Sequence, residues 1–221
     1  MNAQLDPVKP VLYSFRRCPY AMRSRLALKH SGIQVELREV DLKAIPDALR
    51  VLVPDNPTVP VLLLPDGRVI DESWDVLLWA VREHDPDGWL GTDECNLVPA
   101  EQWIEMNDFS FKTDLDHYKY HERYPEQTQL EYRAEAEEFI QDLEDRLQAT
   151  RFLLGDSLSI ADIGVLPFVR QFALVDKGWF DQAPYPKVQA WLADFLESDL
   201  FNSVMEKYAV WNAGDEPAVF G

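Results

Sequence analysis

The sequence predicts an α/β domain at residues 1–85, a linker at 86–98 and an all-helical domain at 99–221. Short β-branched and aromatic runs alternate with helical spacing in the first part, whereas only helical spacing follows the linker. The Asp85–Gly88 turn signal interrupts the first pattern. Charge divides the chain in the same way, because residues 1–90 carry a formal net charge of −2 and residues 91–221 carry −16.

The first domain opens with a predicted buried strand, Val11–Phe15. A helix is expected to begin at Cys18-Pro19, because proline is favoured at the first helical position, and to stop near Gly32. The remaining elements of this domain are a strand at 34–41, a weak helix at 46–53, a hairpin formed by 61–64 and 68–70, and a helix at 73–83.

The second domain has helical spacing at 100–122, 127–150 and 160–176, and two shorter helices after Pro186. Ser159 and Asp162 have the spacing of a capping box, so Asp162 is interpreted as structural. Aromatic residues are frequent near the first of these helices, and core packing is the default explanation for them. The tail, Gly214–Gly221, is expected to be loosely ordered.

Composition excludes several classes of function. The net charge of −18 argues against binding nucleic acid or docking on an anionic membrane. No apolar run is long enough for a transmembrane helix, and residues 1–10 do not have the pattern of a secretion signal. Two cysteines do not suggest a disulfide framework, so a cytoplasmic location is expected.

Cys18 is the strongest candidate for chemistry. A helix N-terminus stabilises a thiolate, and Arg16, Arg17 and Arg23 add positive charge nearby in the sequence. A basic run of five residues without an acid, from Arg16 to Lys29, also suggests that something anionic is held there. Ala21 stands where a second redox cysteine would be, so the predicted chemistry uses one thiol. The alternative is that Cys18 is a small buried hydrophobic residue.

These motifs together resemble the cytosolic glutathione S-transferases. Cys18-Pro19-Tyr20-Ala21, Thr58-Val59-Pro60 and Glu72-Ser73 occur in the family's order, ahead of an all-helical half. The sequence is most similar to the cysteine-type members, omega-like or glutaredoxin-like, of the bacterial kind. The resemblance implies a thioredoxin-like N-terminal domain with a four-stranded mixed sheet and a helical C-terminal domain.

The resemblance also implies roles for four further residues. Pro60 would follow a cis peptide bond, and the Val59 backbone would pair with the cysteinyl part of glutathione. Ser73 would hold the γ-glutamyl carboxylate at a helix N-terminus, and Glu72 would pair with the ammonium group. Taken alone, Ser73 is better explained as a helix cap and Glu72 as a solvated acid, and the neighbouring Val59-Pro60 motif favours the binding roles instead. A lysine for the glycyl carboxylate is not evident, although Lys43 and Arg50 are candidates.

The implied function is a glutathione-dependent thiol transferase or reductase. Cys18 would form a mixed disulfide with glutathione, and the second reactant would be a small electrophile or disulfide. Glutathione would be the co-substrate, and no metal is expected, because His117, His121 and Asp114 are better explained as a solvated helix face. A homodimer is expected. The alternatives are conjugation of glutathione to an apolar electrophile, and a non-catalytic binding module on the same fold.

Overall fold

The computed structural model describes residues 9–221, which form two compact units. Residues 1–8 lie outside this range. They include the start of the predicted first domain and most of the segment, residues 1–10, that does not have the pattern of a secretion signal. The first unit contains the described residues up to Pro86 together with Asn202–Gly221, and the second contains Asp87–Phe201. The grouping differs from the predicted domains at the C-terminal end, because the last twenty residues return to the first unit.

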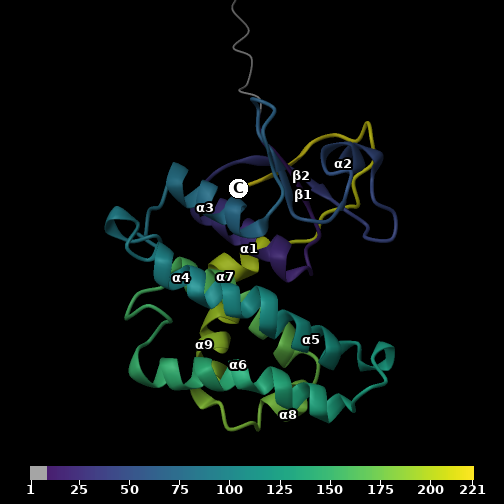
Figure 1. The fold of residues 1–221 in the computed structure, drawn as a ribbon. Coiled ribbons are helices and arrows are strands. Elements are labelled where there is room, and N and C mark those ends of the chain that lie inside the picture. The colour runs from purple at the N-terminus through teal and green to yellow at the C-terminus, as the bar shows by residue number, and fades with distance from the viewer. Residues whose placement is uncertain (1–8) are drawn as a thin grey trace, which may run out of the picture. The chain divides into compact units, whose positions relative to one another are not determined.

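A five-stranded mixed sheet forms the centre of the first unit (Figure 1). Its order is β4-β3-β1-β2-β5, with β1 and β2 parallel and the other neighbouring pairs antiparallel. The mixed sheet is therefore confirmed, but the prediction of four strands is wrong. The strands are β1 (Val11–Ser14), β2 (Val35–Glu39), β3 (Val61–Leu63), β4 (Val69–Ile70) and β5 (Ala218–Phe220).

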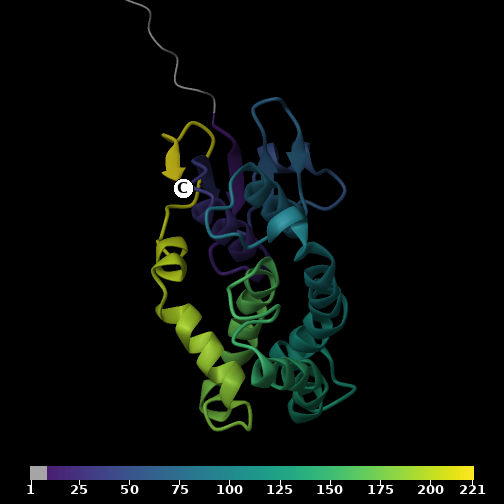
Figure 2. The ribbon, with the colours of Figure 1, turned by 90° about the vertical axis from the view of Figure 1, so that its left-hand side faces the viewer.

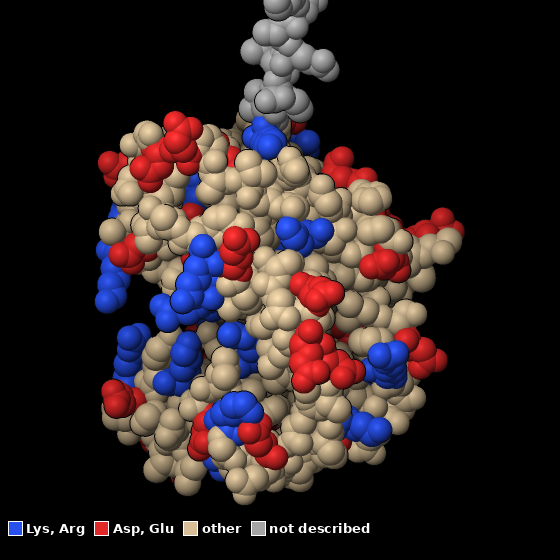
Figure 3. Space-filling model, turned by 180° about the vertical axis from the view of Figure 1, so that it is seen from behind, with Lys and Arg blue, Asp and Glu red and all other residues tan. Residues whose placement is uncertain are grey.

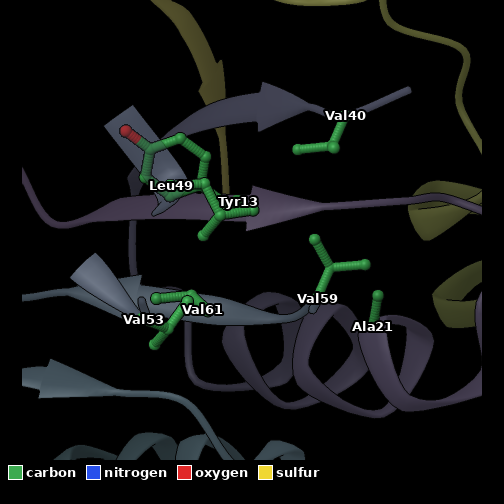
Figure 4. Packing of buried hydrophobic residues seen from close by; sticks show 7 residues of the cluster. All are labelled: Tyr13, Ala21, Val40, Leu49, Val53, Val59 and Val61. Atoms are coloured by element: carbon green, nitrogen blue, oxygen red, sulfur yellow. The ribbon is translucent and has the colours of Figure 1, made fainter. Parts of the chain in front are cut away.

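Helices α1 (Pro19–His30) and α2 (Asp47–Leu52) connect strands of this unit, and α3 (Ser73–Glu83) follows β4 and leads to the second unit. Helices α1 and α3 pack against each other. A cluster of buried side chains joins β1, α1, α2 and β3 (Figure 4). Its members are Tyr13, Ala21, Val40, Leu49, Val53, Val59 and Val61. The cluster buries Val59 in the core, so the turn before β3 has a fixed position relative to α1.

The C-terminal segment forms the fifth strand, so the expectation of a loose tail at Gly214–Gly221 is wrong for its last residues. Figure 2 shows this yellow segment lying beside the first unit's strands. β5 pairs with β2, and Lys29 Nζ donates to the Gly221 carbonyl at 2.9 Å. A Cβ at Gly221 would lie 2.4 Å from the Ile33 carbonyl oxygen, so only glycine fits this approach. The tail is short, and its strand Ala218–Phe220 pairs with the edge that β2 offers.

The second unit is helical, and its helices are α4 (Leu97–Glu105), α5 (Lys112–Lys119), α6 (Gln129–Ala149), α7 (Ile160–Ala173), α8 (Lys177–Phe180) and α9 (Pro186–Glu197), with α10 (Asp199–Val204) crossing into the first unit. The single helix expected at 100–122 is interrupted by a π-helical segment, Met106–Phe111. Phe111, at its end, stacks on Phe139 of α6 with ring centroids 4.6 Å apart. Within residues 9–221, every helix is too short or too polar to cross a lipid bilayer.

Asp162 forms hydrogen bonds to three parts of the second unit: the loop at Leu153, the start of α7 at Ser159, and Trp191 of α9. It is fully buried near the start of α7, and its carboxylate accepts hydrogen bonds from the amide and hydroxyl of Ser159 at 3.0 and 2.6 Å. It also accepts from the Leu153 amide at 2.9 Å and from Trp191 Nε1 of α9 at 3.1 Å. Burial raises the pKa of Asp162, and these four donors partly oppose that rise. The structural interpretation of Asp162 agrees with this network.

Replacing Asp162 with alanine is expected to destabilise the protein by about 3 kcal/mol, because four buried donors would lose their acceptor. Urea unfolding followed by circular dichroism measures the change in the free energy of unfolding. Asp156→Ala is the matched control, since Asp156 is exposed in the loop before α7. Equal unfolding midpoints for the two variants would contradict the proposed role of Asp162.

Candidate functional site

Cys18 is the N-cap residue of α1. Its backbone is extended (φ −74°, ψ 126°), Pro19 takes the first helical position, and the Cys18 carbonyl accepts the first helical hydrogen bond from Met22 at 2.9 Å. The Cys18 amide donates to the Phe15 carbonyl at 2.9 Å, which closes the turn between β1 and α1. The side chain is half-buried. The sequence therefore placed this thiol correctly at a helix N-terminus.

The sulfur of Cys18 lies 3.9 Å from the Val59 carbonyl oxygen, across the turn that precedes β3. The Val59–Pro60 peptide bond is cis, as the resemblance implied. The Val59 amide lies outside β3 and donates to no backbone carbonyl within residues 9–221. It is therefore available to an extended ligand that lies beside Cys18.

A cavity of about 170 Å³ adjoins this turn. It brings together the predicted residues Val59 and Pro60, which precede β3, and Glu72 and Ser73, which follow β4. Cys18 does not line this cavity, although its neighbour Tyr20 does. The complete lining consists of Tyr20, Thr58, Val59, Pro60, Asp71, Glu72 and Ser73.

Ser73 begins α3, and its side chain is held by a residue that the sequence did not assign to the site. Arg23 of α1 is fully buried and donates from Nη1 to the Ser73 hydroxyl oxygen at 3.0 Å. A hydroxyl that accepts this bond keeps its own proton for another acceptor. The arrangement therefore suits an anion at the start of α3, where helical N–H groups also point outward. The basic run from Arg16 to Lys29 was the only sequence signal for Arg23.

Glu39, at the end of β2, fixes the turn that carries Cys18. One carboxylate oxygen accepts from the Arg16 amide at 2.8 Å, and the other accepts from Arg25 Nη2 at 3.0 Å. Arg25 is fully buried in α1, and burial is the main cause that lowers its pKa. This ion pair ties the β1–α1 turn and α1 itself to the sheet.

Other candidates from the sequence lie elsewhere. Lys43 and Arg50 are exposed and do not line the cavity beside Val59 and Pro60. Cys95 is exposed in the second unit. Phe111 and Tyr118 are buried and pack on Phe172, so core packing accounts for them.

Within residues 9–221, the fold brings no third metal-coordinating side chain to His117 and His121. The His117 ring lies against the rings of Tyr124 and Tyr132, with centroids 4.3 and 5.1 Å away. Among the residues that the structure describes, no three His, Cys, Asp or Glu side chains are grouped as metal ligands would be.

Two segments of the chain match models of known protein families. Residues 17–83 match the model of the glutathione S-transferase N-terminal domain, and residues 95–194 match that of the glutathione S-transferase C-terminal domain. The chain belongs to the glutathione S-transferase family. Both halves of this transferase fold are thus present, and the cavity beside Cys18 lies within the N-terminal half.

Individual relatives extend over most of the chain. Glutathione S-transferase U28 of Arabidopsis thaliana is 27% identical over 83% of this chain and 82% of its own length. Glutathione S-transferase omega-1 of Rattus norvegicus is 29% identical over 87% of this chain and 78% of its own. A glutathione transferase structure from Burkholderia graminis, with two glutathione molecules bound per subunit, superimposes with a TM-score of 0.76 at 22% identity and covers 92% of this chain and 90% of its own. At that identity the structural likeness establishes the fold.

Replacing Glu39 with alanine is expected to lower the free energy of unfolding by about 3 kcal/mol, since Arg25 would stay buried without its partner. Chemical denaturation provides the measurement. Glu36→Ala on the same strand is the control, because the Glu36–Arg38 pair is partly exposed and its loss costs less than about 1 kcal/mol. A Glu39 variant no less stable than the Glu36 variant would show that the buried pair does not hold the turn.

Proposed function

We propose that this member of the family is a glutathione-dependent thiol transferase with Cys18 as its nucleophile. The observation that carries the proposal is the position of the Cys18 sulfur, at a helix N-terminus and 3.9 Å from the carbonyl of Val59. A helix N-terminus favours the thiolate, which is the attacking form in thiol–disulfide exchange. The half-buried thiol is open to a small reactant.

Glutathione fits the cavity in one orientation. Its cysteinyl backbone would pair with the free amide and the carbonyl of Val59, which brings its sulfur toward Cys18. Its γ-glutamyl carboxylate would then lie at Ser73, whose hydroxyl proton is left free by Arg23. Glu72, at the N-cap of α3, would face the ammonium group of the same residue. Glutathione bound to structural relatives supports this choice of ligand.

The reaction consists of two thiol exchanges. The Cys18 thiolate attacks the glutathionyl sulfur of a mixed disulfide, and the other thiol leaves as its thiolate. A second glutathione thiolate then attacks the Cys18–glutathione disulfide, releasing oxidised glutathione and restoring Cys18. We propose accordingly that the chain is a cysteine-type, omega-like member, and its likeness to an omega-1 relative is consistent with this. A cytoplasmic location belongs to the same proposal, because reduced glutathione requires a reducing compartment. The homodimer expected from the resemblance to the family is also part of the proposal.

Incubation with oxidised glutathione is expected to add one glutathione to the wild-type protein, as seen by intact mass spectrometry. Cys18→Ser should abolish the adduct and reduce thiol transfer to background. Cys95→Ser is the matched control, because Cys95 is the second free thiol and lies in the other unit.

An adduct that survives Cys18→Ser but disappears in Cys95→Ser would refute the assignment of the nucleophile. If neither the wild type nor Cys18→Ser forms an adduct, while both conjugate glutathione to an aryl halide, the enzyme is a conjugating transferase. Glutathione binding with neither reaction would favour the binding module.

Glu72→Gln and Ser73→Ala are each expected to weaken glutathione binding about tenfold, because each loses one charge-assisted contact. Isothermal titration with reduced glutathione on the Cys18→Ala background measures the dissociation constant without mixed-disulfide formation. Asp75→Asn is the control, since Asp75 is exposed on the first turn of α3 and does not line the cavity. Unchanged affinity in both variants would argue that glutathione binds elsewhere.

A further inference from the structure

The basic run that precedes and follows Cys18 is divided by the fold into two groups. Arg23 and Arg25 are buried and hold Ser73 and Glu39 respectively. Arg16 and Arg17 instead line a separate cavity of about 270 Å³ in the first unit. The proposed glutathione cavity uses neither of these two arginines.

Three segments enclose this second cavity: the β1–α1 turn, the end of β2 and the C-terminal segment. Its lining consists of Phe15, Arg16, Arg17, Glu39, Val40, Asp41, Lys207, Tyr208 and Val210. Figure 3 shows Lys and Arg side chains among Asp and Glu on one face of the molecule, although the chain carries a formal charge of −18. The cavity itself is lined by three basic residues, Arg16, Arg17 and Lys207, and two acidic ones, so it has an excess of positive charge on an acidic protein, which favours an anionic ligand.

Two acidic groups line the cavity, and Glu39 is the one whose charge is paired within the described residues, whereas Asp41 is exposed and bonded only to a backbone amide. Both carboxylate oxygens of Glu39 accept hydrogen bonds, one from the Arg16 amide and one from Arg25. Asp41 accepts from the Lys43 amide at 2.9 Å. Arg17 and Lys207 are exposed, and in the described part of the chain neither forms an ion pair. Two cations are therefore available to a ligand in the cavity.

Two aromatic residues, Phe15 and Tyr208, line the cavity, and aromatic side chains can pack against a flat organic group. The Arg17 guanidinium lies 5.2 Å from the centroid of the Phe15 ring, and the Tyr208 ring stands on the C-terminal side of the same cavity. An aromatic ligand with one carboxylate or sulfonate could contact these rings and place its charge between Arg17 and Lys207.

The cavity shares the β1–α1 turn with Cys18, although Cys18 itself does not line it. Arg17 directly precedes Cys18, and the Phe15 carbonyl accepts the hydrogen bond from the Cys18 amide. A group bound against Phe15 and Arg17 therefore lies at the turn that carries the sulfur.

We propose that the cavity bounded by Arg17 and Lys207 binds the acidic part of the second substrate, an aromatic organic anion joined through sulfur to glutathione. The proposal rests on the thiol-transfer function proposed above and names its substrate class. The Cys18 thiolate attacks the glutathionyl sulfur, the bond to the aryl sulfur breaks, and the arylthiolate leaves with the electron pair. Glutathione then reduces the Cys18 disulfide and is released in oxidised form.

The test compares two mixed disulfides of glutathione, one made with 4-mercaptobenzoate and one with 4-mercaptobenzamide. They have nearly the same shape and differ in the remote charge. We expect the ratio of kcat/KM for benzoate to that for benzamide to fall about threefold in Lys207→Gln or Arg17→Gln, and about tenfold in the double variant. Lys187→Gln, an exposed lysine of the second unit, should leave the ratio unchanged. Because the leaving-group difference between the two substrates is the same for every variant, it cancels when the ratio for a variant is divided by the ratio for the wild type.

A binding experiment separates this inference from the reaction itself. The Cys18→Ala protein is titrated calorimetrically with 4-(methylthio)benzoate and with 4-(methylthio)benzamide. Tighter binding of the benzoate that is lost in the Lys207→Gln and Arg17→Gln variants supports the anion cavity. Equal affinity for the two probes, or a preference that survives both substitutions, overturns it.

The two proposals fail in different ways. If neither mixed disulfide is cleaved by the wild-type protein, thiol transfer is wrong, and so is the assignment of a substrate class to it. If both are cleaved with a ratio that no substitution changes, thiol transfer stands and the anion cavity is wrong.

Discussion

Glu39 forms the hydrogen bonds that connect the β1–α1 turn, helix α1 and the C-terminal segment to the end of β2. Its two carboxylate oxygens fasten the β1–α1 turn and the buried Arg25, while its backbone carbonyl accepts the Trp211 amide at 2.8 Å. Arg25 also donates to the Val204 carbonyl at 3.5 Å, so one ion pair reaches α1, β2 and the C-terminal segment. A buried arginine is costly to desolvate, and this pairing makes its burial tolerable. The position of Cys18 follows from this arrangement.

The first unit could be predicted well from its sequence because its signals are local. Pro19 after Cys18 specifies a helix start, and α3 ends at Glu83, as expected, although Glu72 rather than Ser73 is its N-cap residue. The resemblance to a family implied the cis peptide bond before Pro60, and the residues around Pro60 alone would not have specified it. Val59, Glu72 and Ser73 meet in one cavity because the β3–β4 hairpin folds the chain back between them.

The missed features depend on contacts that no local pattern records. The tail at 218–220 has no strong strand signal, and its pairing with β2 exists only in three dimensions. Arg23 and Arg17 look alike in the sequence, yet one is buried against Ser73 and the other is exposed beside Phe15. The π-helical segment at Met106–Phe111 likewise reflects the packing of Phe111 on α6. In each case, tertiary packing overrides what propensity alone predicts.

The pairing of β5 with β2 also determines the order in which the protein is completed on the ribosome. Residues of β1 to β4 emerge early, but their fifth neighbour is made only after the whole helical unit. Throughout that interval the nascent sheet has β2 as an open edge, which another chain could capture. Glu36 and Arg38 alternate along β2 and place charge on that edge, which discourages such capture. The charge of these two residues therefore matters for the edge of β2 during synthesis as well as for the finished sheet.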